Sequence, residues 1–83
     1  LYKLMDGRVE PLEFLIRKDS DLIGIRLQDM RLKKNLLIAG IGRNGKLIMP
    51  GGQDEFLPGD SVIVVTTNSG FGDIHDILEK KGA

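Results

Sequence analysis

Residues 36–67 constrain the fold of this chain more than any other stretch. Short apolar runs lie at 36–41 and 62–65, and turn residues stand between them. Apolar runs that are this short and end at turn residues are typical of buried strands. Asn44-Gly45 predicts a tight hairpin turn, because both residues tolerate a positive φ, and Leu57-Pro58-Gly59-Asp60 predicts a second corner. The stretch therefore predicts a hairpin, formed by strands at 36–43 and 46–49, followed by a central strand at 61–67.

A further strand is expected upstream, where apolar and polar residues alternate between Val9 and Arg17. Alternation with a period of two marks a half-buried strand, and Pro11 places that end of the strand at a sheet edge or a bulge. Leu15 breaks the polar face of this strand and is a candidate interface residue.

Two helices are expected to cover the sheet. Ile23, Leu27 and Met30 recur at helical spacing, which predicts a short helix over 25–30. A C-terminal amphipathic helix is predicted over 71–81, with aspartates near its start and lysines near its end, as the helix dipole favours. The expected fold class is α+β: a small, mostly antiparallel β-sheet with a short helix and a C-terminal amphipathic helix.

Length and charge limit the classes of function. Eighty-three residues form one domain, and we expect a linker or terminal strand at 1–8 and the domain itself at 9–81. Twelve basic residues balance twelve acidic ones, which argues against nucleic-acid binding and electrostatic membrane attachment. No apolar run reaches the roughly 18 residues of a membrane span. Because the first residue is Leu1 rather than methionine, we expect a piece of a longer protein.

Catalysis and metal binding find little support. The chain has no cysteine, which excludes thiolate catalysis and sulfur-bound zinc. Its single histidine, His75, lies on the predicted last helix, where a surface role is far commoner than that of a general base. The glycines at 40, 42 and 45 match the spacing of a dinucleotide fingerprint, but that fingerprint must open a helix, and here a strand follows. We therefore expect neither an enzyme nor a metal protein.

Arg43 is the most suggestive single residue. It ends a predicted strand beside the Asn44-Gly45 turn, where an anionic group could accept charge-assisted hydrogen bonds. The alternative is an ordinary arginine facing solvent at a strand end. Gly40 and Gly42 share one face of the same strand and indicate either the close approach of another backbone or ligand, or simply a bulge.

Taken together, these motifs resemble the TrkA C-terminal domain, the second half of the RCK (regulator of potassium conductance) module. The resemblance is carried by LLIAGIGRNG at 36–45, IMP at 48–50 and LPGDSVIVV at 57–65, and it extends over roughly residues 9–78. Gly40 and Gly42 depart from the family pattern, in which an alanine or an aliphatic residue is usual.

The resemblance implies a regulatory, ligand-sensing domain that forms a homodimer and is not an enzyme. Such domains belong to bacterial potassium uptake systems of the Trk or Ktr kind. They lie in the cytoplasm and are held at the inner face of the membrane by a membrane-embedded potassium transporter subunit. The preceding Rossmann-like half of TrkA proteins binds NAD(H) or ATP, and that half is absent from this sequence. Some family members bind cyclic di-AMP at the dimer interface. The ligand-binding candidates are Arg43 and Asn44, with Ile41 as an apolar neighbour that could contact an adenine.

Three alternatives remain open on the sequence. The domain could be a purely structural assembly module, or the regulatory domain of a different ion transporter. A nucleic-acid module of the OB or cold-shock type would need aromatic residues that stack bases on one sheet face. The four aromatic residues do not cluster in the sequence; they are Tyr2, Phe14, Phe56 and Phe71. We therefore expect no nucleic-acid partner, and no direct membrane insertion is expected either.

Overall fold

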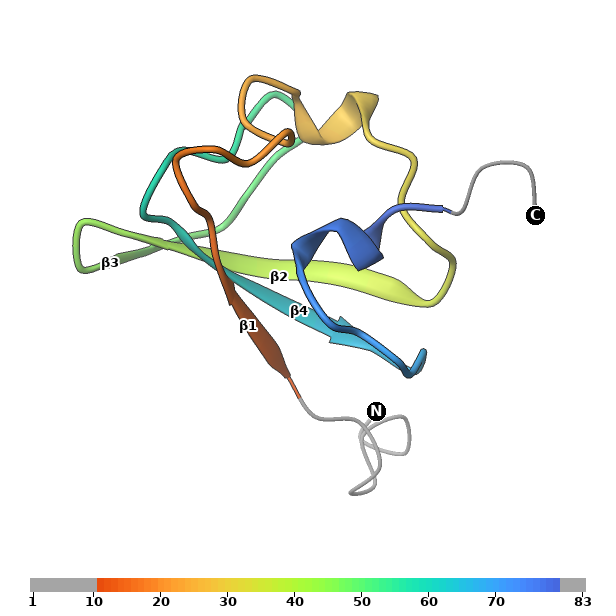
Figure 1. Ribbon diagram of the computed structural model, residues 1–83. Helices are drawn as coiled ribbons and strands as arrows, with labels where there is room; N and C mark the ends of the chain where they lie inside the picture. Colours follow the sequence, from red (N-terminus) through yellow and green to blue (C-terminus); the bar gives the residue numbers. More distant parts are fainter. Residues whose placement is uncertain (1–10, 80–83) are drawn as a thin grey trace.

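A computed structural model describes residues 11–79, which form a small four-stranded antiparallel sheet in the order β1-β4-β2-β3 (Figure 1). The expectations for residues 1–8 and for Lys80 and Lys81 lie outside the described residues. The strands and the two 3₁₀ turns have the following bounds: β1 Leu12–Leu15, η2 Leu27–Asp29, β2 Leu36–Arg43, β3 Lys46–Ile48, β4 Ser61–Thr66 and η3 Ile74–Ile77.

The central pair of strands is β2 and β4, and a bulge in β2 adjusts their register. The pairing shifts between Ile38 and Gly40, which leaves Ala39 as the extra residue. Because side chains alternate between the two faces of a strand, this extra residue returns Ile41 to the same face as Ile38. Both isoleucines thereby enter the core, and Gly40 and Gly42 face the other side of the sheet.

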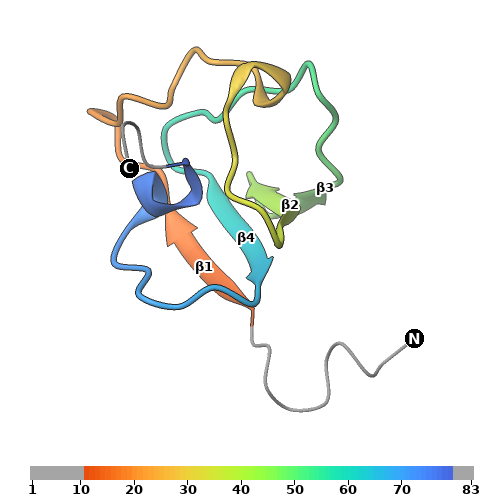
Figure 2. The same cartoon turned by 90° about the vertical axis from the view of Figure 1, so that its right-hand side faces the viewer.

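The core lies on one face of the sheet, beneath η2, η3 and the long loops (Figure 2). Residues 23–26 run beside 55–56 through two isolated bridges, and Phe56 is inserted completely into the core from the loop between β3 and β4. The buried apolar side chains are Ile16, Leu22, Ile38, Ile41, Phe56, Val62, Val64, Ile74 and Ile77. The loops thus supply much of the cover that helices would provide in a larger domain.

The C-terminal amphipathic helix predicted over 71–81 is wrong for the described residues, because residues 71–79 form only the single 3₁₀ turn η3. Asp73 caps this turn, with its carboxylate accepting a hydrogen bond from the His75 N–H at 2.7 Å. The Leu78 backbone is then extended and pairs with Leu32, and the Glu79 N–H donates to the Arg31 carbonyl at 2.7 Å. Strand-like pairing with residues 31–33 therefore replaces helical hydrogen bonds after Ile77.

The predicted short helix is similarly reduced to the single turn η2. The N–H groups of Leu27 and Gln28 donate to the carbonyls of Asp54 and Gly52, both at 2.9 Å. The N–H groups of the first helical turn have no partner inside a helix, and here the neighbouring loop satisfies two of them. Met30 already has an extended backbone, so the helix ends after Asp29.

The corner before β4 is a hydrogen-bonded turn, as the sequence predicts. The Asp60 N–H donates to the Leu57 carbonyl at 3.1 Å, and Gly59 has a φ of 88°. The Ile16 N–H donates to the Asp60 carbonyl and the Gly59 N–H to the Ile16 carbonyl, both at 2.8 Å. The corner therefore fixes the chain just after β1 as well as the start of β4. In the described part of the chain, no helix is long and apolar enough to cross a membrane.

Replacing Gly59 with alanine is expected to lower the free energy of unfolding by about 1 kcal/mol, because a side chain is strained at positive φ. A Cβ at this position would meet no other atom within 4 Å, so the cost comes from the backbone alone. Gly51→Ala is the matched control, since its φ is not positive and its Cβ would make only an ordinary contact at 3.8 Å. Urea unfolding of both variants checks this, and equal losses would contradict it.

Candidate functional site

Arg43 ends β2, and its side chain reaches across to the corner before β4. Its Nε donates to Asp60 Oδ1 at 2.9 Å and its Nη2 to Asp60 Oδ2 at 2.7 Å. Nη2 also donates to the Glu55 carbonyl at 2.9 Å. Two parallel hydrogen bonds between a guanidinium and a carboxylate form the strongest and most directional kind of ion pair. The end of the hairpin is thereby fixed to the loop that precedes β4.

Asp60 is the buried member of this pair, with only 1% of its surface exposed. Its Oδ2 also accepts a hydrogen bond from the Leu57 N–H at 2.8 Å, so the carboxylate accepts three in all. The hydrogen bond from Arg43 lowers the pKa of Asp60, against the effect of burial, which raises it. The same hydrogen bond raises the pKa of Arg43. Both groups therefore remain charged at neutral pH.

Stability is expected to fall in acid because of this ion pair. The pKa of Asp60 lies below its ordinary value of 3.8 in the folded chain, so its contribution is fully present above that value. It is lost as the pH falls through the lower pKa of the folded state. Urea unfolding between pH 2 and pH 6 checks this, with Asp60→Asn expected to show a shallower dependence. Equal slopes for the two proteins would contradict the assignment.

The ion pair leaves one nitrogen of Arg43 unused. Nε and Nη2 make all of its hydrogen bonds within the described residues, while Nη1 makes none. The side chain as a whole is 25% exposed. Nη1 is therefore the part of the guanidinium that is available to bind an anion from solvent.

The three sequence-predicted ligand residues do not share one surface. Asn44 is exposed in the turn, with a φ of 52°, and adjoins Arg43 at the end of the hairpin. Ile41 is completely buried, paired with Ile48 on one side and Val62 on the other. The structure thus brings Arg43 and Asn44 together and places Ile41 in the core. From the sequence, Asp60 was predicted only as a turn residue, although an acid beside an apolar strand was a signal for a buried partner of Arg43.

The face of the sheet opposite the core carries exposed apolar side chains from several strands. Leu15, Leu37 and Leu47 are 64%, 61% and 64% exposed. The register places Leu47 opposite Gly42, and a Cβ on Gly40 would lie 2.8 Å from Leu47 Cδ1. The Leu47 side chain therefore lies over Gly40, which explains why this position is a glycine. We call this apolar surface the outer face, and its members are Leu15, Leu37, Leu47, Ile63 and Val65.

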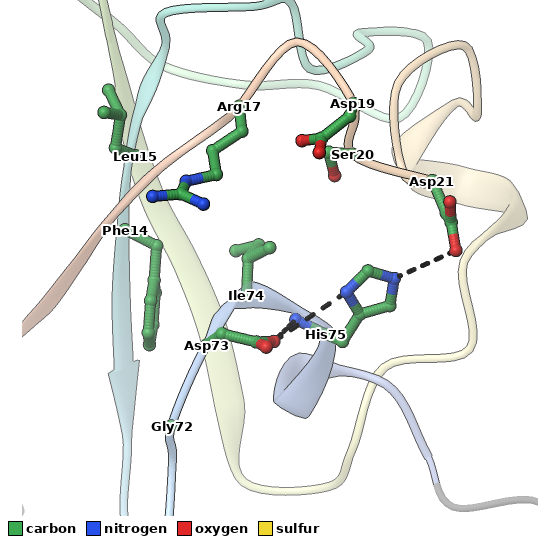
Figure 3. Close-up of a pocket in the computed structure, with 10 residues that line it drawn as sticks. All are labelled: Phe14, Leu15, Arg17, Asp19, Ser20, Asp21, Gly72, Asp73, Ile74 and His75. Carbon is green, nitrogen blue, oxygen red and sulfur yellow. Dashed lines mark hydrogen bonds and ion pairs between the residues drawn. The ribbon is translucent and has the colours of Figure 1, made fainter.

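His75 lies in an open hollow of about 440 Å³ between the end of β1 and η3 (Figure 3). Its Nε2 is 3.7 Å from Asp21 Oδ2 and its Nδ1 is 3.8 Å from Asp73 Oδ1. In Figure 3 the Arg17 side chain points toward Phe14 and Leu15, away from His75. His75, Asp21 and Asp73 are all exposed, so solvent screens the attraction between the histidine and the two carboxylates. His75 is therefore a surface residue, as expected. Among the described residues, no group of three or more potential ligands could hold a metal ion.

Comparison with solved structures gives the same fold class. A structure described as "Structure of RCK domain with cda" matches with a TM-score of 0.57 and 24% identity, over 65% of this chain and 76% of that one. The two chains thus share the fold of a small antiparallel sheet. The family model of the TrkA-C domain matches residues 12–79, and this chain belongs to that family. The resemblance stated from the sequence is confirmed.

Two relatives are Trk system potassium uptake proteins from Methanosarcina mazei and Pyrococcus abyssi. The Trk system potassium uptake protein TrkA homolog 2 of Methanosarcina mazei is 33% identical over 76 residues, or 92% of this chain and 17% of the relative. The TrkA homolog of Pyrococcus abyssi is 30% identical over 73 residues, or 87% of this chain and 32% of the relative. This chain therefore spans less than a third of the length of either relative.

Proposed function

We propose that this TrkA-C domain is a cytoplasmic, ligand-sensing and dimerising regulatory domain of a Trk-type potassium uptake system. The match of the TrkA-C family over residues 12–79 is the observation that carries the proposal. Potassium is the proposed transported ion because the relatives are Trk system potassium uptake proteins. The partner would be a membrane-embedded potassium transporter subunit, which holds the domain at the inner face of the membrane. Regulation, not catalysis, is the proposed activity.

A domain exchange tests this function. The matching segment of the Methanosarcina mazei TrkA homolog 2 is replaced by this chain, and potassium uptake is measured in cells that lack their own TrkA. We expect the exchanged protein to support potassium uptake that is regulated in the same way as with the unmodified protein. A protein truncated before the segment is the control. Uptake equal to that of the truncated control would overturn the proposal.

The proposed ligand is cyclic di-AMP, with Arg43 and Asn44 as its polar contacts. Two features support it: Nη1 of Arg43 has no partner among the described residues, and the similar RCK domain structure is described "with cda". Ile41 would support the strand from the core side. NAD(H) or ATP would bind only to a preceding Rossmann-like half. Calorimetry with cyclic di-AMP tests the ligand, with AMP as the control, and no heat at sub-millimolar nucleotide would exclude it.

The outer face supports the proposed homodimer. It carries apolar side chains from all four strands, with the charged Glu13 of β1 beside Ile63, and large exposed apolar patches often mark protein–protein contacts. Lys46 in the short edge strand β3 and Pro11 before β1 disfavour pairing at the sheet edges. Four strands of about five residues cover roughly 300 Å². A standard interface needs about 800 Å² from each partner, so the outer face would form its apolar centre.

A purely structural assembly module is the second candidate function. One observation favours it: Asp60 already neutralises Arg43 within the fold, so the charge that would attract an anion is balanced. A dimer that is indifferent to nucleotides in calorimetry would support this candidate. A further alternative is that this domain regulates a different ion transporter. In that case the segment that precedes it would not match the TrkA relatives.

A further inference from the structure

We propose that Asn44 is a site of spontaneous deamidation, in which the Gly45 backbone nitrogen attacks the side-chain amide of Asn44. Two groups that are neighbours in one chain react as if each were present at a very high concentration, provided that nothing obstructs their approach. The two-residue turn between β2 and β3 holds such a pair. The reaction requires neither the transporter nor the ligand proposed above.

The attacking nitrogen is unobstructed. Gly45 lies between the paired ends of β2 and β3, and its N–H donates no hydrogen bond within the described residues. The side chain of the residue that follows an asparagine is the usual obstacle to this attack, and glycine has none. Even the position that a Cβ would occupy has no other atom within 4 Å. Asn44 is exposed, and its side-chain amide has no hydrogen-bond partner in the described part of the chain.

The other two asparagines lack this combination. Asn35 is also exposed, and its φ of 61° is close to the 52° of Asn44. However, it is followed by Leu36, which has a branched side chain and is paired with β4. The side chain of Asn68 donates to the Lys34 carbonyl at 2.8 Å, and this hydrogen bond must break before the amide can react. The structure therefore favours deamidation at one asparagine of the three.

The reaction balances without an oxidant, a reductant or an enzyme. The Gly45 nitrogen loses its proton to solvent and bonds to Cγ of Asn44. The bond from Cγ to the side-chain nitrogen breaks, and that nitrogen takes up a proton and leaves as ammonia. Water then opens the resulting cyclic imide at either of its carbonyls. The products are aspartate and isoaspartate, in which the main chain continues through Cβ, and the sum is water consumed and ammonia released.

The two products affect the hairpin differently. Both add a negative charge at its end, beside Arg43. Isoaspartate also inserts Cβ into the backbone of the turn, and the pairing of Arg43 with Lys46 depends on the length of that turn. β3 has only three residues and pairs only with β2 in the described sheet. Isoaspartate is therefore expected to loosen β3, whereas aspartate keeps the ordinary backbone.

Peptide mass spectrometry of the whole chain, after incubation in mildly alkaline buffer, tests the site. Asn44 should lose its amide at least about tenfold faster than Asn35, because no side chain raises the barrier to attack. Asn44→Gly keeps the positive φ and removes the reacting group, so conversion of this variant should fall to the rate of the two remaining asparagines. Equal rates at Asn44 and Asn35 in the wild type would overturn the inference.

The effect on the hairpin is tested on the isoaspartate product, purified by chromatography. Asn44→Asp is the matched control, because it carries the same added charge on an ordinary backbone. The isoaspartate chain should unfold at a lower urea concentration than Asn44→Asp, and the amides of β3 should exchange with solvent at least about tenfold faster. Equal unfolding and equal exchange in the two chains would overturn the proposed loosening of β3.

Discussion

Asp60→Ala is expected to lower the free energy of unfolding by about 3 kcal/mol, the cost of removing one partner from a buried ion pair. The variant leaves the Arg43 guanidinium half buried, with the Glu55 carbonyl as its remaining partner among the described residues. It also removes the acceptor of the Leu57 N–H inside the corner. For a domain of this size such a loss is a large part of the total stability, and urea unfolding at neutral pH measures it.

The control for this prediction is an ion pair of the same chemistry on the surface. Arg26 Nε lies 3.1 Å from Asp29 Oδ2, and both side chains are about half exposed. Asp29→Ala should therefore change the free energy of unfolding by less than about 1 kcal/mol. Similar losses in the two variants would show that burial does not set the strength of the Arg43–Asp60 pair.

The sequence predicted the sheet well because its signals are local. The turn at Asn44 and Gly45 has φ values of 52° and 76°, as such a hairpin requires, and the corner at Gly59 also has a positive φ. The helices were predicted less well because their ends depend on distant partners. The periodic stripe after Phe71 is compatible with a helix, but pairing of Leu78 with Leu32 is a long-range contact that no local pattern reveals.

The candidate site was predicted in part for the same reason. Arg43 could be singled out from its place between a strand and a turn, both of which are local features. Its partner Asp60 is seventeen positions away, and the pairing depends on how β2 and β4 align. The burial of Ile41 follows from the bulge at Ala39, which changes the face that each later residue of β2 occupies. The glycines at 40 and 42 indicated a bulge as one of two alternatives, but they did not show which residue of β2 is the extra one.

Leu37→Lys is expected to weaken the proposed homodimer about 30-fold or more. Leu37 lies on the outer face, 61% exposed, beside Val65 on the neighbouring strand. In a two-fold dimer each substitution appears twice, and burying an unpaired polar group costs about 1–3 kcal/mol each time. Every 1.4 kcal/mol is about a tenfold change in the dissociation constant. Sedimentation over a range of concentrations should therefore find the variant at its monomer mass of 9.2 kDa where the wild type is dimeric.

Ile25→Lys separates an effect of the outer face from a general effect of added charge. Ile25 is 37% exposed and belongs to the segment that pairs with residues 55–56, over the opposite face of the sheet. This variant should sediment like the wild type, while Leu37→Lys should not. Because Leu37 is exposed in the single chain, its replacement should leave the unfolding free energy of the monomer nearly unchanged. Dissociation without loss of monomer stability would assign the interface to the outer face, and a Leu37→Lys chain that still dimerises would place the interface elsewhere.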